Sequence, residues 1–223
     1  MTLLESLNYY MPELMTSIKE TGIMMGISMS FCVVIGLPLG IFMFMSNPHI
    51  KGKKTLSYWL FNFVVTFIRS FPYLLFVITL IPLTRLILGR AFGPYPASFP
   101  LSIMAVVLYA RLAEQVLLDV PKETALLAES LGASKWQYIW HFLLPEARSG
   151  LILAYTTSAV SMVSYSTVMG IIGGGGIGDF AIRYGYQSYQ YGIMAVAIAL
   201  MIFSVFIIQM VGNTVSQRLD KRK

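Results

Sequence analysis

The chain has 223 residues, of which 57% are hydrophobic and only 12% are charged, and its formal net charge is +6. Because soluble domains carry roughly 25% charged residues, this composition excludes an ordinary soluble domain. It predicts an all-α integral membrane protein built as one bundle. A basic excess can also signal a nucleic-acid partner, but the basic residues here follow a membrane-orientation pattern, described below, so no nucleic acid is expected.

The chain begins with an expected interfacial segment and a first span. Residues 1–17 are polar, aromatic and mixed in charge, which is typical of a short helix at a membrane surface. Residues 22–45 carry no charge and are long enough to cross roughly 30 Å of hydrocarbon, with Pro38 expected to kink the span. Glycine pairs in this span have a spacing that lets another helix approach closely. They are Gly22 with Gly26 and Gly36 with Gly40.

A second hydrophobic stretch, Thr55–Thr84, is longer than one straight span needs and is interrupted by Arg69. A charge at membrane depth is costly unless it is paired or wetted, which would place Arg69 on a polar path. Alternatively, Arg69 reaches the interface from a shallow position along its aliphatic stem. Ser70 and Pro72 beside it favour irregular backbone facing a cavity, and both interpretations stay open.

Three further spans are predicted. One covers residues 97–110 and extends toward residue 118, the next covers 149–172, and the last covers 191–211 and is followed by a basic tail, 212–223. The second half of the 149–172 span is rich in hydroxyl groups, which either bond across helices or line a polar path. Five spans place the two termini on opposite sides of the membrane.

The positive-inside rule selects the orientation, because short cytoplasmic loops carry an excess of Lys and Arg. Most of the 16 basic residues fall after the first span, in and beside a polar segment near residue 130, and at the C-terminus. They are Lys51, Lys53, Lys54, Arg111, Lys122, Lys135, Arg148, Arg218, Lys221, Arg222 and Lys223. These regions are therefore expected in the cytoplasm, with the N-terminus outside and the C-terminus inside.

The polar segment after the third span predicts a pair of short helices. Pro121 suits the first turn of a helix, and Gly132 is placed to end that helix with a left-handed residue. Ser134 and Gln137 have the spacing of a capping box that begins the second helix. Pro145 is expected to end it.

An apolar stripe at helical spacing lies on the second helix of this pair. It consists of Trp136, Ile139, Trp140 and Leu143. One interpretation is an amphipathic pair lying on lipid headgroups with its Trp residues as anchors. The other is a structured knob that docks into a soluble partner, and amphipathicity alone does not decide between them.

Residue identities in this segment resemble the cytoplasmic signature of bacterial ABC-importer permeases. Gly132 and the pair Leu144–Pro145 stand at the spacing of that signature, and Ala128 occupies its second alanine position. Phe142 replaces an Ile, and Leu126–Leu127 replace the Glu-Ala pair, with Glu129 displaced downstream. Further stretches look like the methionine-importer permeases, so that the resemblance runs from about residue 20 to 211. They are Phe67–Pro72, Ile81–Arg85, Leu144–Ala147 and the glycine-rich region up to Tyr189.

The resemblance implies a type I ABC importer permease fold, with a transmembrane domain over residues 18–211 and a coupling element at 121–145. It implies a homodimer, a separate ATPase dimer that binds ATP, an extracytoplasmic substrate-binding protein, and methionine or a related small amino acid as solute. The coupling residues would be Ala128, Gly132, Ala133, Leu144 and Pro145. Candidate path residues are Arg69, Ser161, Met162, Ser164, Tyr165 as a gate, and Ser166. The external mouth would hold Gly173, Gly174, Gly175, Gly176 and Gly178.

The motifs for bound nucleotides or catalysis are not found in the sequence. The run 173–178 formally fits G-x-G-x-x-G, but no strand precedes it, and no phosphate loop of the form G-x-x-x-x-G-K-[ST] exists. Neither an enzymatic activity nor a metal or other cofactor is therefore expected. The competing hypotheses are a permease for another small solute, a standalone channel, and an intramembrane enzyme.

Overall fold

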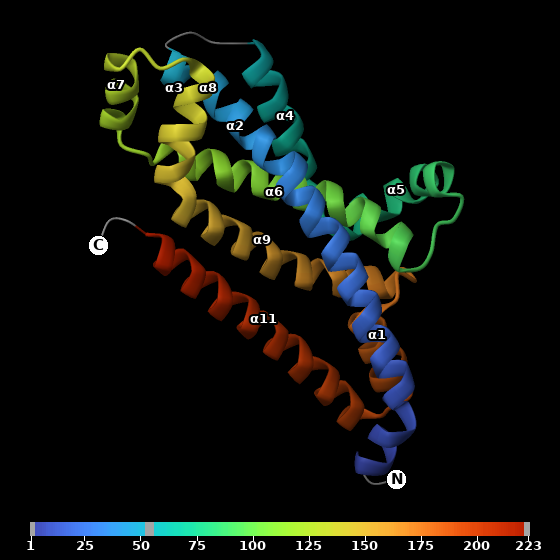
Figure 1. Cartoon of the computed structure of the whole chain (residues 1–223). Coiled ribbons are helices and arrows are strands. Elements are labelled where there is room, and N and C mark those ends of the chain that lie inside the picture. The colour runs from blue at the N-terminus through green and yellow to red at the C-terminus, as the bar shows by residue number, and fades with distance from the viewer. Residues whose placement is uncertain (1–2, 52–55, 221–223) are drawn as a thin grey trace.

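The computed structural model describes residues 3–51 and 56–220, and within these ranges every regular element is helical (Figure 1). Lys53, Lys54, Lys221, Arg222 and Lys223, which support the predicted orientation, lie outside the described residues. The helices, with π-helical turns marked η, are α1 (Leu3–Phe31), η1 (Cys32–Gly36), α2 (Leu37–Ser46), α3 (Pro48–Lys51), α4 (Leu56–Ser70), α5 (Tyr73–Leu88), α6 (Pro94–Leu118), α7 (Lys122–Ser130), α8 (Lys135–Gln137), η2 (Tyr138–Leu143), α9 (Leu144–Ile171), α10 (Gly176–Phe180), η3 (Ala181–Gln187) and α11 (Tyr191–Leu219).

Among the described residues, four helices are long and apolar enough to cross a membrane: Glu5–Ser46, Pro94–Leu118, Lys135–Ile171 and Tyr191–Leu219. The helices α4 and α5 pass the same test only as a pair, and they are bent by 108° where they meet. The predicted count of five spans is therefore reached when this bent pair is counted as one broken span.

The first span differs from its prediction, because no break separates it from the N-terminal segment. One helix of 42 residues runs from Glu5 to Ser46. A π-helical turn, Cys32–Gly36, ends two residues before Pro38, and the Leu37 amide then bonds four residues back to the Val33 carbonyl. A wider turn of this kind accommodates a residue without an amide hydrogen and spares the helix a sharp break.

The break between α4 and α5 follows from Pro72. Its ψ of 123° lies outside the helical region, and it offers no amide hydrogen to continue α4. The Phe71 amide closes α4 on the Ile68 carbonyl, and the Phe76 amide begins α5 on the Pro72 carbonyl. This confirms the irregular backbone predicted beside Arg69.

The fourth span corrects the prediction for Pro145. One helix runs from Lys135 to Ile171, so Pro145 does not end the second helix of the polar segment, which is continuous with the span. The π-helical turn η2 precedes the proline, with the Leu144 amide bonded to the Ile139 carbonyl. As at Pro38, the wide turn accommodates a residue that has no amide hydrogen. The sequence rule that proline stops a helix therefore fails at both prolines.

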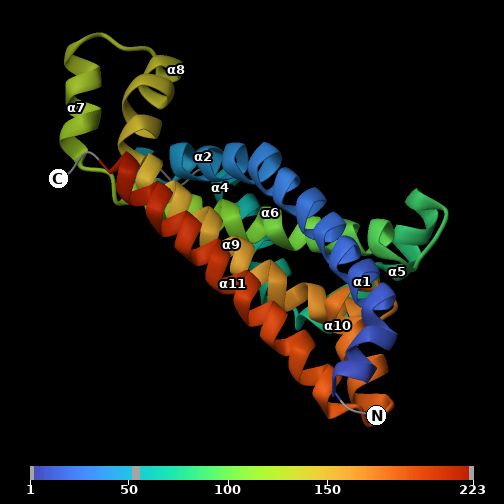
Figure 2. The same cartoon turned by 60° about the horizontal axis from the view of Figure 1, so that its bottom comes forward.

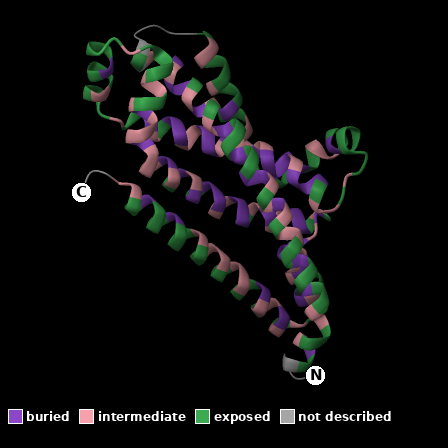
Figure 3. Ribbon diagram, in the orientation of Figure 1, coloured by how far each residue is buried: buried purple, intermediate pink, exposed green. Residues whose placement is uncertain are grey.

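The last span also extends past its predicted end, because α11 continues to Leu219 through much of the predicted tail. Two polar contacts attach its C-terminal half to α9. The hydroxyls of Ser149 and Ser216 lie 2.8 Å apart, and the Arg148 side chain donates to the Leu219 carbonyl at 2.8 Å. Elsewhere α11 is largely exposed and lies along one side of the bundle (Figure 3).

The protein core surrounds α6, which packs between α1, α2 and α9 (Figure 2). Its fully buried side chains include Leu101 and Ala105, which meet Met24, Cys32 and Met162 from α1, η1 and α9. Burial of apolar groups by a central helix stabilises a bundle through close packing, whereas the apolar outer faces suit a lipid environment. The exposed side chains concentrate on α4, α5, α7 and α11 (Figure 3).

The two ends of the bundle carry different elements. Helix α7, the start of α9 and the C-terminal end of α11 lie together at one end in both views (Figures 1 and 2). The N-terminal end of α1 lies with α10 and η3 at the opposite end. The polar segment and the glycine run are therefore separated by the length of the bundle.

Candidate functional site

The polar segment folds as the sequence predicts at its turn. Helix α7 follows Pro121 and stops at the exposed Gly132, whose φ of 67° is left-handed. The Ala133 amide returns to the Ala128 carbonyl at 2.9 Å. Ser134 and Gln137 form the predicted capping box, with the Ser134 amide bonded to the Gln137 side chain at 2.8 Å and the Gln137 amide to the Ser134 hydroxyl at 3.4 Å. These local bonds hold α7 and the start of the next helix as a rigid pair.

Large apolar side chains cover the outside of this pair and find no cover in the protein. Between 52% and 68% of each side chain in this group is exposed: Leu126, Leu127, Leu131, Trp136 and Trp140. We call these five residues the docking surface. Ala128, in contrast, is buried, and the two Trp rings contact each other edge to face at a 5.6 Å centroid separation. An exposed apolar patch on a rigid element is typical of an interaction site.

The four residues of the apolar stripe predicted on the second helix do not all lie on one face. Leu143 is fully buried in a cluster with Phe44, Leu117 and Ala147, whereas Trp136 and Trp140 point outward. The π-helical turn η2 rotates the register between them, because each such turn inserts about one extra residue. Leu143 and the buried Ala147 thus attach the helix pair to the ends of α2 and α6, and Leu144 and Pro145 lie half-buried at the start of α9.

At the opposite end, the glycine run forms an ordered turn. Gly173, Gly175 and Gly176 all have positive φ, between 77° and 88°, which L side chains rarely adopt. The Glu20 carboxylate accepts the Gly176 amide at 2.7 Å, and the Thr21 hydroxyl accepts the Ile177 amide at 2.9 Å. The run therefore connects α9 to α10 while α1 holds its backbone, and the residues after it are helical through Gln187.

Glu20 should determine how well this turn stays closed. Glu20→Ala removes the charged acceptor of the Gly176 amide, so we expect hydrogen exchange at Gly176 and Ile177 to accelerate about tenfold or more. Glu20→Gln retains an acceptor oxygen and serves as the matched control, with exchange close to that of the unmodified protein. Equal protection of both amides in Glu20→Ala would contradict this role for Glu20.

The candidate path residues of α9 divide between two faces of the helix. Met162 and Ser166, four residues apart, are buried in the protein interior, and the Ser166 hydroxyl donates to the Val163 carbonyl at 2.7 Å. Ser161, Ser164 and Tyr165 share the other face and are exposed or half-exposed. Of these five residues of α9, only the second group is accessible from outside the protein interior.

Tyr165 connects α9 to the break between α4 and α5. Its ring stacks on that of Tyr73, the first residue of α5, with centroids 4.3 Å apart and an interplanar angle of 26°. Tyr73 is 8% exposed, and among the described residues its hydroxyl has no hydrogen-bond partner. Arg69 is exposed in the last turn of α4. This exposure is compatible both with a place on a polar path and with a side chain that reaches the membrane interface.

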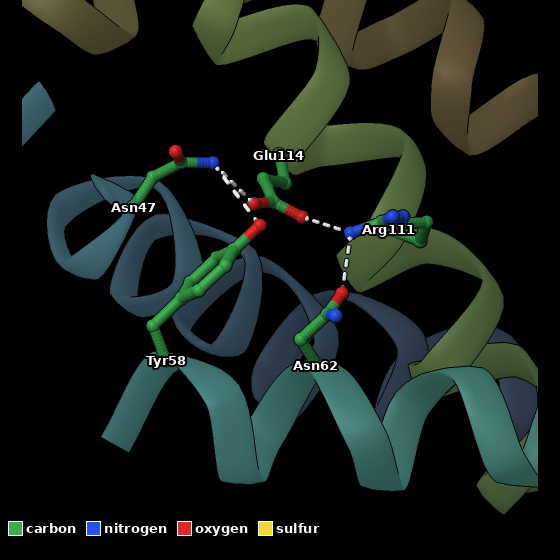
Figure 4. Close-up of polar contacts among 5 residues, drawn as sticks. All are labelled: Asn47, Tyr58, Asn62, Arg111 and Glu114. Atoms are coloured by element: carbon green, nitrogen blue, oxygen red, sulfur yellow. Dashed lines mark hydrogen bonds and ion pairs between the residues drawn. The ribbon is translucent and has the colours of Figure 1, made fainter. Parts of the chain in front are cut away.

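A buried polar network joins α4 to the neighbouring helices (Figure 4). Glu114 of α6 is 1% exposed, and its carboxylate accepts from Arg111 at 2.8 Å and from Asn47 at 3.0 Å. The same Arg111 donates to Asn62 of α4 at 3.0 Å, and Asn47 donates to the Tyr58 hydroxyl of α4 at 3.2 Å. We call Asn47, Tyr58, Asn62, Arg111 and Glu114 the α4 clasp.

Sequence reasoning missed the α4 clasp. The available signal was the pair Arg111 and Glu114, three residues apart and therefore on one face of a helix at the end of a span. A buried carboxylate is strongly unfavourable unless it is paired and hydrogen-bonded. Asn47 bonds Glu114 from the link between α2 and α3, Asn62 of α4 bonds Arg111, and Tyr58 of α4 bonds Asn47. These segments are distant in the sequence, and no local rule brings them together.

The fold is that of a membrane-embedded transport subunit of the type I ABC importer class. Residues 36–223 match the family described as binding-protein-dependent transport system inner membrane component. The chain belongs to this family, whose members are integral membrane permease components.

Curated relatives cover most of the chain. It is 37% identical over 209 residues to the probable D-methionine transport system permease protein MetI of Vibrio cholerae, covering 94% of this chain and 93% of that protein. The methionine import system permease protein MetP of Bacillus subtilis is 36% identical over 159 residues, covering 71% and 72% of the two chains. The family assignment therefore agrees with the resemblance in the sequence motifs.

Solved structures agree on the fold. A chain of the MetNI methionine ABC transporter, described as having inward facing conformations, superimposes with a TM-score of 0.91 at 31% identity, covering 95% of this chain and 98% of that chain. A structure of an amino acid ABC transporter with histidines gives a TM-score of 0.78 at 17% identity, covering 96% and 97%. At that identity the second likeness concerns the fold alone.

Proposed function

We propose that this chain is the membrane-spanning permease subunit of an ATP-driven importer that carries methionine or a related small amino acid. The single observation that carries the proposal is the docking surface, a rigid and uncovered apolar patch at the end of the bundle opposite the glycine turn. A channel has no need for such a surface. The similarity to permeases named for methionine transport supports the choice of solute.

Two copies of the chain would form the path, and two ATPase subunits would bind the docking surfaces. One bundle of five spans, with a broken one among them, seldom encloses a polar path, so a two-fold dimer is expected. The ATPase supplies the energy, and nucleotide-driven closure would rotate the bundles between inward- and outward-facing states. Leucines at 126 and 127, which replace the Glu-Ala pair of the family signature, suit an apolar contact with the ATPase.

In this proposal the docking end faces the cytoplasm and the glycine turn faces outward, where a substrate-binding protein would deliver the solute. The basic residues described above support this orientation, and it puts the N-terminus outside. The candidate path residues are reduced to Ser161, Ser164 and Tyr165, with Arg69 beside the broken span, because these side chains are accessible. The transmembrane domain remains assigned to residues 18–211, with the coupling element at 121–145.

Reconstitution tests the proposal directly. The chain, its ATPase and the binding protein would be placed in vesicles, and uptake of labelled methionine would be followed with and without ATP. We expect ATP-dependent uptake that unlabelled methionine competes away and that unrelated amino acids do not. Uptake competed instead by another small solute would correct the substrate but keep the permease, whereas flux through the chain alone without ATP would identify a channel.

A further inference from the structure

Helix α4 is weakly attached to the bundle apart from the α4 clasp. Its only fully buried side chain is Val65, which meets Met43 and Val107, and its further apolar contacts are those of the half-buried Ile68 and of Phe61 with Phe42. The outer face of α4 exposes an aromatic series whose members stack on one another. That series is Trp59, Phe63 and Phe67, with successive ring centroids 5.8 Å and 6.0 Å apart. Since little apolar surface holds α4, its polar contacts decide which neighbour it moves with.

The neighbour that the α4 clasp selects is the end of α6 nearest the docking surface. Helix α6 ends at Leu118, and α7 begins only four residues later at Lys122. Leu117 of α6 is also buried in the same cluster as Leu143 from the second helix of the docking pair. Both halves of the docking element are therefore fixed to the α6 end that carries Arg111 and Glu114.

At its other end, α4 leads to the candidate gate. It stops at Ser70, and after the 108° bend at Phe71 and Pro72, α5 begins with Tyr73. Tyr73 stacks on Tyr165 at 4.3 Å. A displacement of α4 would therefore change the position of Tyr73 against Tyr165.

We propose that the α4 clasp makes α4 move with α6 and α7, so that motion at the docking surface repositions Tyr73 against Tyr165. Asn62 and Tyr58 are thus positioning residues for transport, acting through α4 and the broken span. Energetic coupling between distant sites passes through packed and hydrogen-bonded groups of this kind, and it needs a direct test. This inference rests on the proposed function for its transport readout but not for its distance readout.

The double variant Tyr58→Phe with Asn62→Leu tests the linkage most sharply. It removes both bonds to α4 but leaves Glu114 with Arg111 and Asn47, so that the buried charge stays paired. We expect assembly and ATP hydrolysis to persist while solute moved per ATP falls about fivefold or more. Thr66→Val, an exposed polar-to-apolar change one turn along α4, is the matched control and should leave that ratio unchanged.

A second readout follows the helices themselves. Spin labels at the exposed Leu60 of α4 and Leu118 of α6 should report one narrow distance, with and without nucleotide, in the otherwise unmodified complex. In the double variant the distribution of distances between the two labels should become broader, or the mean distance should change with nucleotide. Asn62→Leu alone, the milder variant, removes the bond to Arg111 and should broaden it to a lesser extent.

The outcomes separate the two proposals. An unchanged transport ratio together with a narrow distance in the double variant would overturn the linkage, as would an unchanged distance in Asn62→Leu if the double variant did not assemble. If the unmodified complex moved no amino acid, the proposed function would fail, and the distances would still decide whether the α4 clasp links α4 to α6.

Discussion

Gly132→Asp is expected to weaken binding of the ATPase about thirtyfold or more while leaving the permease folded. Gly132 is exposed between α7 and the capping box, and a Cβ built there meets nothing within 4 Å. The substitution therefore creates no clash in the protein, and Asp tolerates left-handed backbone better than most residues. Its charge would be left unpaired beside an apolar docking surface on association. Co-purification and a binding titration with the ATPase measure the effect.

Gly132→Asn is the matched control, because it has nearly the same shape and backbone tolerance but no charge. We expect it to retain most of the affinity. An undiminished complex with Gly132→Asp would argue against docking through this turn. Equal loss in both variants would assign the effect to shape or backbone strain at Gly132.

Gly178→Ala is expected to displace α10 from α9 and to lower the stability of the end of the bundle that carries the glycine turn by about 1–3 kcal/mol. A Cβ at Gly178 would lie 2.5 Å from the Thr167 Cα and 2.7 Å from its carbonyl oxygen. Both are backbone atoms of α9, which cannot rotate away as a side chain does. Thermal unfolding of the purified permease and its yield in the membrane measure the loss.

Gly26→Ala provides the comparison on α1. A Cβ there meets nothing within 4 Å, so within one protomer the change should be neutral or slightly stabilising in a helix. Similar unfolding temperatures for Gly178→Ala and the unmodified protein would contradict the close approach of α10 to α9. A loss with Gly26→Ala as large as with Gly178→Ala would instead point to a second chain packed on that face of α1.

Local rules predicted the parts of the protein whose causes are local. The left-handed Gly132, the capping box of Ser134 and Gln137, and the interruption beside Pro72 depend on residues within a few positions of one another. The spans followed from the length and hydrophobicity of each stretch. The division of Ser161, Ser164 and Tyr165 from Met162 and Ser166 could also have been predicted, because helical spacing places them on different faces.

Other features depended on tertiary context. Pro38 and Pro145 do not end their helices, because a π-helical turn precedes each one, and helical periodicity and proline position do not predict such a turn. The α4 clasp joins residues up to 67 positions apart, as in the bond between Asn47 and Glu114. The size of the bend at Pro72 is set by the helices that α5 packs against, chiefly α6.

The slight burial of α11 has a consequence for how the protein is made. Every buried member of the main core lies between Met24 and Met169, and α11 adds only the half-buried Ile208 to it, so nearly all of this core is present in the nascent chain before α11 has been synthesised. Only the small cluster around Phe180, Ile193 and Ala197 must await the start of α11. Folding during synthesis can thus proceed in two stages. The earlier helices form a bundle first, and α11 packs on its surface after it leaves the insertion machinery.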